Sequence, residues 1–246
     1  MSHDPTTNEC YGPDLALVHD RGFGVHADRV APGLLSLLEG VRRQGGLVHE
    51  IGCGAGALTR HLVSAGHLVI ASDASPAFLE IVRQNLPDVD VRCIRLPDDA
   101  VPVADAVVGV GHVLNYLPDA TAVRRALTAL AATLRPGGLL ALDLCDLAFG
   151  VREVEAPDAR VGDDWAIVTR FSSPRPDRFV RDITTFLRED DGRWRRSDER
   201  HDTVLLETAA VPSWLDGTGV RAGIQAAFGT EEMPRGLVVL VGEKEG

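Results

Sequence analysis

The sequence predicts an α/β protein with a doubly wound, mostly parallel sheet of seven strands and a small antiparallel β insert. Two observations lead to this expectation. Strand-like apolar segments alternate with helix-like segments over residues 47–144, and such alternation requires a parallel sheet. Beyond residue 150 the pattern changes to strands in which apolar and polar residues alternate, which is typical of an antiparallel sheet.

The expected core elements follow one another in a regular order. Strands are expected at 47–51, 68–72, 89–94, 105–110 and 138–144, and helices at 56–65, 76–85 and 119–134. A short helix at 208–216 and strands at 220–228 and 236–242 are expected to complete the sheet as a final antiparallel hairpin.

Two further segments flank this core. Before the first strand we expect a short helix and turn over 13–24 and a second helix over 31–43, with Pro32 in its first turn. After the fifth strand, period-two strands are expected at 165–171, 179–188 and 193–206, with a hairpin turn at Asp191-Gly192. This insert is expected to pack against the mouth of a ligand pocket.

The first strand runs into a turn that contains Gly52, Gly54 and Gly56 and then into a helix. A strand that enters a glycine-rich turn before a helix is a nucleotide-binding arrangement, because glycine lets the backbone pass close beneath a ligand. Ligands of such sheets bind at the carboxyl ends of the strands, where the strand order reverses. Asp73, at the end of the second strand, is placed to hold a ribose.

The glycine spacing by itself leaves two nucleotides open. Gly52-x-Gly54-x-x-Ala57, with Asp73 further on, also satisfies the loose dinucleotide fingerprint of an NAD(P)-dependent oxidoreductase. Glu50 favours a different ligand, because a carboxylate there opposes a pyrophosphate at the helix N-terminus. S-adenosylmethionine has no phosphate, and its ammonium group suits Glu50.

Four motifs in order make the chain resemble the class I S-adenosylmethionine-dependent methyltransferases, which have a Rossmann-like sheet of seven strands. The motifs are Glu50-Ile51-Gly52-Cys53-Gly54-Ala55-Gly56, Val69-Ile70-Ala71-Ser72-Asp73-Ala74-Ser75-Pro76, Asp105-Ala106-Val107-Val108-Gly109-Val110-Gly111-His112-Val113-Leu114-Asn115-Tyr116-Leu117 and Leu134-Arg135-Pro136-Gly137-Gly138-Leu139-Leu140-Ala141-Leu142-Asp143. The resemblance implies S-adenosylmethionine as the cofactor and an N-terminal segment that folds over it as a lid.

The cofactor contacts that we expect combine the glycine turn, the ribose acid, the loop after the fourth strand and the lid. These residues are Tyr11, His19, Glu50, Gly52, Cys53, Gly54, Gly56, Asp73, Ala74, Leu96, Gly111 and His112. Many family members carry an acid after the third strand for the adenine amino group. Here either Asp98 or backbone groups near Leu96 could serve, and the sequence leaves both open.

Three residues are catalytic candidates: His112, Glu199 and His201. His112 follows the fourth strand and could accept a proton or simply cap the cofactor, while Tyr116 on the same loop could be a buried wall. Glu199 and His201 lie two apart on a strand, so both point to one face, where they could orient an amine or hydroxyl or belong to a solvated surface. No third ligand accompanies them at a convincing spacing, and we expect no metal.

Charge and cysteine usage narrow the functional class. The net charge is −11 and the pI about 5.1, which argues against a nucleic-acid substrate. Cys10, Cys53, Cys93 and Cys145 form no Cys-x-x-Cys pair, so reduced thiols are expected. No signal peptide or membrane span is evident, and we expect a cytoplasmic location without membrane partners.

The resulting hypothesis is methyl transfer from S-adenosylmethionine to an oxygen or nitrogen of a small-molecule metabolite. We expect N-terminal lid helices over 1–46, a cofactor-binding core over 47–150 and 207–246, and the β insert over the acceptor pocket at 151–206. Alternatives are aminocarboxypropyl transfer or cyclisation on the same fold, an NAD(P)-dependent oxidoreductase, and a non-catalytic binding domain. The acceptor and the oligomeric state are not predicted.

Overall fold

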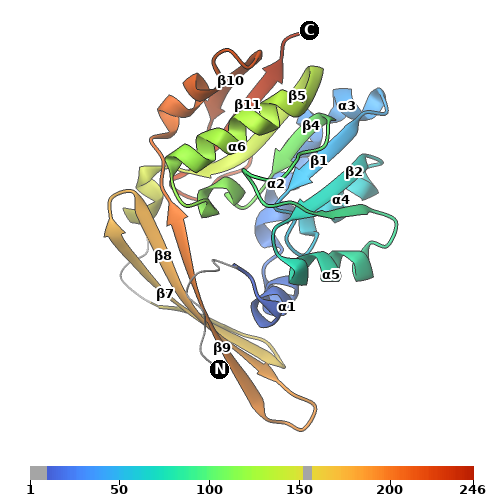
Figure 1. The fold of residues 1–246 in the computed structure, drawn as a ribbon. Helices are drawn as coiled ribbons and strands as arrows, with labels where there is room; N and C mark the ends of the chain where they lie inside the picture. The colour runs from blue at the N-terminus through green and yellow to red at the C-terminus, as the bar shows by residue number, and fades with distance from the viewer. Residues whose placement is uncertain (1–9, 152–156) are drawn as a thin grey trace.

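The computed structural model describes residues 10–151 and 157–246, and two β-sheets organise them (Figure 1). The strands of the larger sheet are β1 (Leu47–Ile51), β2 (Leu68–Asp73), β3 (Asp90–Cys93), β4 (Ala104–Gly109), β5 (Leu134–Cys145), β10 (Val220–Gln225) and β11 (Leu237–Lys244). They lie in the order β10-β11-β5-β4-β1-β2-β3. All pairs are parallel except those that involve β11, which runs antiparallel to β5 and β10. The expected fold class is confirmed.

The helices cover both faces of this sheet. They are α1 (Pro13–Gly22), α2 (Val25–Leu37), α3 (Glu39–Arg43), α4 (Ala57–Ser64), α5 (Pro76–Asn85) and α6 (Ala120–Thr133), with 3-10 helices η1 (Val113–Tyr116), η2 (Leu147–Val151) and η3 (Thr208–Leu215). Successive residues of β4 face opposite layers: Val108 packs with α2 and α4, and Val107 packs with α6. Burial on both faces explains why the strands read as almost continuous apolar runs.

The strand order places the site. β1 pairs with β2 on one side and with β4 on the other, so the chain order reverses between them. In doubly wound sheets ligands bind at the carboxyl ends of the strands at this reversal. Ile51 and Asp73 end the first two strands there, and Gly111 follows β4 at the same edge.

The insert forms a second, antiparallel sheet. Its strands are β6 (Asp158–Val161), β7 (Trp165–Arg175), β8 (Arg178–Arg188) and β9 (Trp194–Val204), paired in that order. Figure 1 shows β7, β8 and β9 extending away from the core, with α1 close to them. Leu15 and Val18 of α1 are buried against Ile167, Ile183 and Leu187 of this sheet. The N-terminal helix therefore packs between the insert and the core.

The structure corrects some expected elements. The helix expected at 31–43 begins earlier, as α2 from Val25, and breaks before α3, so Pro32 lies inside α2 and not in its first turn. Proline removes one backbone donor, but burial of Ala31 and Leu34 on one face keeps the helix continuous. The short strand β6 was not expected. In the described ranges, no helix is both long and apolar enough to cross a bilayer.

Candidate active site

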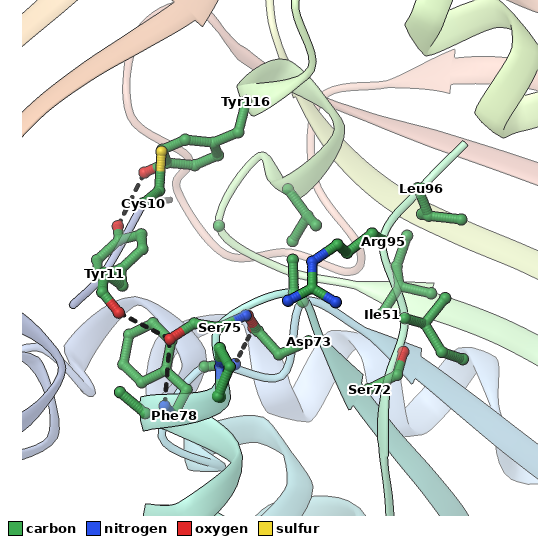
Figure 2. Close-up of a pocket in the computed structure, with 18 of the residues that line it drawn as sticks. Cys10, Tyr11, Ile51, Ser72, Asp73, Ser75, Phe78, Arg95, Leu96 and Tyr116 are labelled. Carbon is green, nitrogen blue, oxygen red and sulfur yellow. Dashed lines mark hydrogen bonds between the residues drawn. The ribbon is translucent and has the colours of Figure 1, made fainter. Parts of the chain in front are cut away.

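A cavity of about 570 Å³ lies at the carboxyl ends of the core strands, a volume typical of small-molecule sites (Figure 2). It is lined by residues 10–13 and 19, by the ends of β1 and β2, by the start of α5, and by residues 94–96, 110–111, 113–114 and 116–118. Among the described residues of the insert, none lines it. The cavity therefore belongs to the core and the N-terminal segment.

The glycine turn after β1 is shaped by close contacts. Gly52 has φ +58°, and a Cβ atom there would lie 2.4 Å from the Cγ atoms of Val113. Gly54 has φ +54°, and its N–H donates to Asp73 Oδ2 at 2.9 Å. Only glycine combines this left-handed backbone with such close packing. The turn thus presents its backbone to the cavity, as the sequence predicts for Gly52 and Gly54.

Asp73 lines the cavity with its carboxylate held in one orientation. Oδ2 accepts the N–H of Gly54, and Oδ1 accepts the N–H of Ser75 at 2.8 Å. Burial raises the pKa of Asp73, while these backbone hydrogen bonds act in the opposite direction. A carboxylate has about four lone-pair positions, so each oxygen can accept one more hydrogen bond. This geometry suits the two hydroxyls of a ribose.

Glu50 lies elsewhere than we expected. It is buried, it does not line the cavity, and its Oε2 accepts a hydrogen bond of 2.7 Å from Thr59 of α4. Burial raises the pKa of Glu50 to about 8, so the side chain is largely uncharged at neutral pH. An argument that needs a Glu50 carboxylate facing the ligand is therefore not supported, because this face of β1 is covered by α4.

Two other residues of the turn also lie outside the cavity lining. Cys53 is buried beneath the turn, where burial raises the pKa of its thiol, and it packs with Leu79 and Val82. Gly56, with φ +83°, is the N-cap residue that precedes α4. Both residues shape the turn from behind. Ala74, Gly111 and Leu96, in contrast, line the cavity as expected.

The end of the cavity after β3 lacks a carboxylate among its described lining residues. Leu96 lines it, but Asp98 does not, because Asp98 pairs with Arg125 at 2.8 Å. Arg95 lines the cavity, and Figure 2 shows its guanidinium reaching over it toward Asp73. Of the two options that the sequence left open for adenine, the structure places only Leu96 at the cavity.

The N-terminal segment closes the other end with aromatic rings. The Tyr11 and Tyr116 hydroxyls form a hydrogen bond of 2.8 Å, drawn as a dashed line in Figure 2, and Arg181 Nη2 also donates to the Tyr116 hydroxyl. His19 lines the cavity and stacks on Phe23, with ring centroids 5.2 Å apart. Burial lowers the pKa of His19 to about 4, so this ring is neutral at physiological pH.

Glu199 and His201 share one face of β9, as their spacing predicts, but neither lines the cavity. Glu199 Oε2 accepts the backbone N–H of Tyr11 at 2.9 Å and the His201 Nε2–H at 2.9 Å, and Oε1 accepts the N–H of Gly12 at 3.0 Å. We expected this pair to face an acceptor. The structure instead engages the carboxylate with the N-terminal segment, because α1 packs on the insert there.

His112 also lies outside the cavity lining. Its backbone has φ +49°, its ring is stacked on Tyr116 with centroids 5.6 Å apart, and burial lowers its pKa to about 3. Its backbone N–H donates to Asp143 Oδ1 at 2.6 Å, and the N–H of Gly111 donates to Oδ2 at 3.0 Å. Asp143, at the end of β5, thus holds the loop after β4.

Asp143 also pairs with a residue that the sequence did not single out. His26 Nε2 lies 2.8 Å from Asp143 Oδ2, and the His26 side chain is 26% exposed whereas that of Asp143 is fully buried. Burial opposes ionisation of Asp143, but the hydrogen bond and charge of His26 hold its pKa below the ordinary value. The result is a buried carboxylate that orients a partly accessible imidazole.

The sequence carried at most a partial signal for the residues that it did not identify as functional. Asp143, like Asp73, is an acid at the end of an apolar strand, and that position could have identified it. His26 lies between two expected helices, and Arg181 is one of several arginines in a polar strand, so no local pattern marked either. In the described parts of the chain, no group of three or more histidine, cysteine or acidic residues is placed to hold a metal ion.

Comparison with known proteins assigns the domain. Residues 49–142 match the methyltransferase domain family. The chain carries a class I S-adenosylmethionine-dependent methyltransferase domain. The match spans the glycine turn, Asp73, the loop after β4 and most of β5, and the cofactor of the methyltransferase is S-adenosylmethionine.

Individual relatives resemble this chain over longer stretches. The ubiquinone biosynthesis O-methyltransferase of Methylocella silvestris (strain DSM 15510 / CIP 108128 / LMG 27833 / NCIMB 13906 / BL2) is 33% identical over 181 residues, which cover 67% of this chain and 64% of that protein. The X-ray structure of the sugar N-methyltransferase KedS8 from Streptoalloteichus sp ATCC 53650 aligns over 100% of both chains, with TM-score 0.77 and 22% identity.

A second similar structure carries the cofactor. It is SAM-bound CalS10, an amino pentose methyltransferase from Micromonospora echinaspora, with TM-score 0.72 and 18% identity, covering 97% of this chain and 99% of that one. At these identities the two structures show a common fold. The residues of the cavity are compatible with the same cofactor, because Asp73 has free lone pairs toward it and the turn at Gly52 leaves no room for a side chain.

Proposed function

We propose that this methyltransferase acts on an oxygen or nitrogen of a small-molecule acceptor. The observation that supports this most strongly is the N-terminal segment over the cavity, where Tyr11 and Gly12 are held by Glu199. A site covered in this way excludes a folded macromolecule and admits a metabolite. The named relatives include an O-methyltransferase and a sugar N-methyltransferase, so both nucleophiles remain in the proposal.

The cofactor contacts in this proposal follow from the geometry. Asp73 would accept hydrogen bonds from the ribose, the backbone of the turn at Gly52 and Gly54 would face the methionine part, and Leu96 would lie along the adenine. His19 and Tyr11 would cover the methionine end and exclude water. When bound, S-adenosylmethionine supplies an electrophilic methyl group.

His26 does not line the cavity either, but it is the proton acceptor in this proposal because Asp143 connects it to the cavity residue Gly111. The acceptor's nitrogen or hydroxyl must be free of a proton to attack, and a histidine held by a carboxylate is suited to remove it. Asp143 orients the His26 ring at 2.8 Å and at the same time fixes the cavity residue Gly111. His112, our initial candidate, would instead form a neutral wall beside Tyr116.

Two measurements test the reaction. Calorimetric titrations with S-adenosylmethionine, S-adenosylhomocysteine, NAD and NADP should show binding of the first two only. Incubation with labelled cofactor and a metabolite extract should then give a small product heavier by one methyl group. Saturable nicotinamide binding without a response to S-adenosylhomocysteine would contradict the proposal, and so would a product that gains an aminocarboxypropyl group.

The role of His26 has its own test. His26→Gln can still donate a hydrogen bond to Asp143 but cannot accept a proton, so turnover should fall by about 10²–10⁴-fold while S-adenosylhomocysteine affinity stays within twofold or so. His61→Gln is the matched control, because His61 forms a similar 2.8 Å pair with the exposed Asp28. Normal turnover of the folded His26→Gln variant would remove His26 from the chemistry.

A further inference from the structure

Arg181 on β8 is a partly buried cation whose Nε atom is fully buried. Its Nη2 donates to the Tyr116 hydroxyl, contact with the Tyr11 hydroxyl also helps to raise the pKa of Arg181, and Nε is buried without a partner among the described residues. No acidic side chain within the described ranges forms an ion pair with it. By contrast, the surface residues Arg195 and Arg92 pair with Asp14 and Asp90, each at 2.6 Å.

A buried Nε–H without an acceptor is costly, and an anion would supply that acceptor. A guanidinium does not lose its proton in proteins, so burial cannot neutralise it as it neutralises a histidine or a lysine. The contacts of Arg181 are with neutral groups: the Tyr116 hydroxyl, the Tyr116 ring, whose centroid is 5.5 Å from Arg181 Cζ, and the Tyr11 side chain. These contacts compensate the lost hydration only in part. A planar, partly exposed donor edge with an unpaired Nε–H is suited to a carboxylate or phosphate group.

The position of Arg181 favours the acceptor over the cofactor. Arg181 belongs to the insert, whose described residues do not line the cofactor cavity, and it contacts Tyr116, which does line it. Aromatic rings lie next to Arg181 and Tyr116: His112 stacks on Tyr116, and His201 is the cross-strand neighbour of Arg181. Both histidines have a lowered pKa, mainly through burial and also through the charge of Arg181, so they add no competing positive charge.

We propose that Arg181 binds an oxyanion, a carboxylate or phosphate group, carried by the acceptor molecule. This inference rests on the proposed function, because it assigns the acceptor to the side of Tyr116 that faces the insert. It predicts that acceptors of this enzyme are anionic at one end and carry the nucleophilic oxygen or nitrogen at the other. The net charge of −11 does not oppose this, since the nearby cation Arg181 determines binding at the site.

The Arg181 Nε–H resonance of the ¹⁵N-labelled protein, saturated with S-adenosylhomocysteine, provides the test. The signal is assigned by its loss in Arg181→Lys. Titration with sodium formate and with inorganic phosphate should shift it saturably. In Arg181→Lys, which keeps the charge but loses the planar fork, formate should bind at least about tenfold more weakly, as read from the backbone amide signal of Tyr116 in both proteins. Arg188→Lys, on the exposed end of the same strand, should leave the titration unchanged.

Two outcomes would overturn the proposal. In the first, neither anion shifts the Arg181 signal of the wild-type protein. In the second, S-adenosylhomocysteine alone shifts it, and Arg181→Lys weakens S-adenosylhomocysteine but not 5′-methylthioadenosine, which lacks the carboxylate; the guanidinium then serves the cofactor. Failure of the proposed function is separate, because it would be seen as absent S-adenosylhomocysteine binding or absent methyl transfer in the wild-type protein.

Discussion

Glu199→Gln should detach the N-terminal segment from the insert. Glu199 is only 15% exposed, and each of its oxygens accepts at least one N–H, from Tyr11 and His201 at Oε2 and from Gly12 at Oε1. In glutamine one oxygen is replaced by NH2, so a donor must face a donor whichever way the amide turns. At least one charge-assisted hydrogen bond is lost, about 1.5–3 kcal/mol.

This loss should appear as weaker cofactor binding. Tyr11 and Gly12 line the cavity, so binding requires the segment to be in place, and the apparent Kd rises as the closed population falls. The apparent Kd should rise by at most roughly 10- to 150-fold. Calorimetry with S-adenosylhomocysteine measures the Kd, and hydrogen exchange of the two amides measures the opening directly. Glu189→Gln, which alters a more exposed pair with Arg195, is the control.

One result would refute this reasoning. If folded Glu199→Gln binds S-adenosylhomocysteine normally, shows unchanged exchange at residues 11 and 12, and loses turnover, then Glu199 serves the acceptor. That was our expectation from the sequence. The structure argues against it, because the carboxylate is already occupied by backbone donors.

Three further outcomes are expected. Asp73→Asn should weaken S-adenosylhomocysteine binding by roughly 10- to 150-fold in calorimetry, because charged hydrogen bonds of about 1.5–3 kcal/mol are lost. Asp98→Asn is the control and should bind normally; equal affinities of the two variants would exclude Asp73 from the ribose site. Gly52→Ala should lose cofactor affinity, and adding Val113→Ala should restore part of it by relieving the 2.4 Å contact; no rescue would mean that backbone strain dominates. Burial lowers the pKa of His49 to about 4, so the folded protein resists protonation of this ring and its stability falls as pH drops from about 6.5 toward 4. Between pH 7 and pH 5, the free energy of unfolding measured in urea should therefore fall by about 1–2 kcal/mol less in His49→Gln than in the wild-type protein.

Much of the fold could be predicted because its signals are local. The glycine turn follows an apolar strand directly, and the hairpin turn at Asp191-Gly192 lies between two alternating strands. Helix boundaries in the N-terminal segment were predicted less well. Pro32 indicated a helix start, yet burial of Leu34 against the core outweighs the missing donor. Packing against a sheet that is distant in sequence decides such cases.

Within the site, sequence position determined which residues reach the strand ends. Asp73 and Gly52 were found in this way, because the end of a parallel strand and the turn after it define their place. The sequence could not tell that Glu50 is covered by α4, since the apolar runs of a sheet buried on both faces do not reveal which neighbour covers each face.

What the sequence by itself determined is therefore the α/β architecture and the positions of the glycine turn and of Asp73 at the strand ends, all set by residues close together in the chain. The tertiary structure decided the partners: His26 meets Asp143 across 117 residues, and Glu199 meets Tyr11 across 188. Such pairs leave no periodic or spacing signal, because they form only when separate elements pack. The physical reason is that a side chain's charge, exposure and role depend on neighbours that folding brings to it.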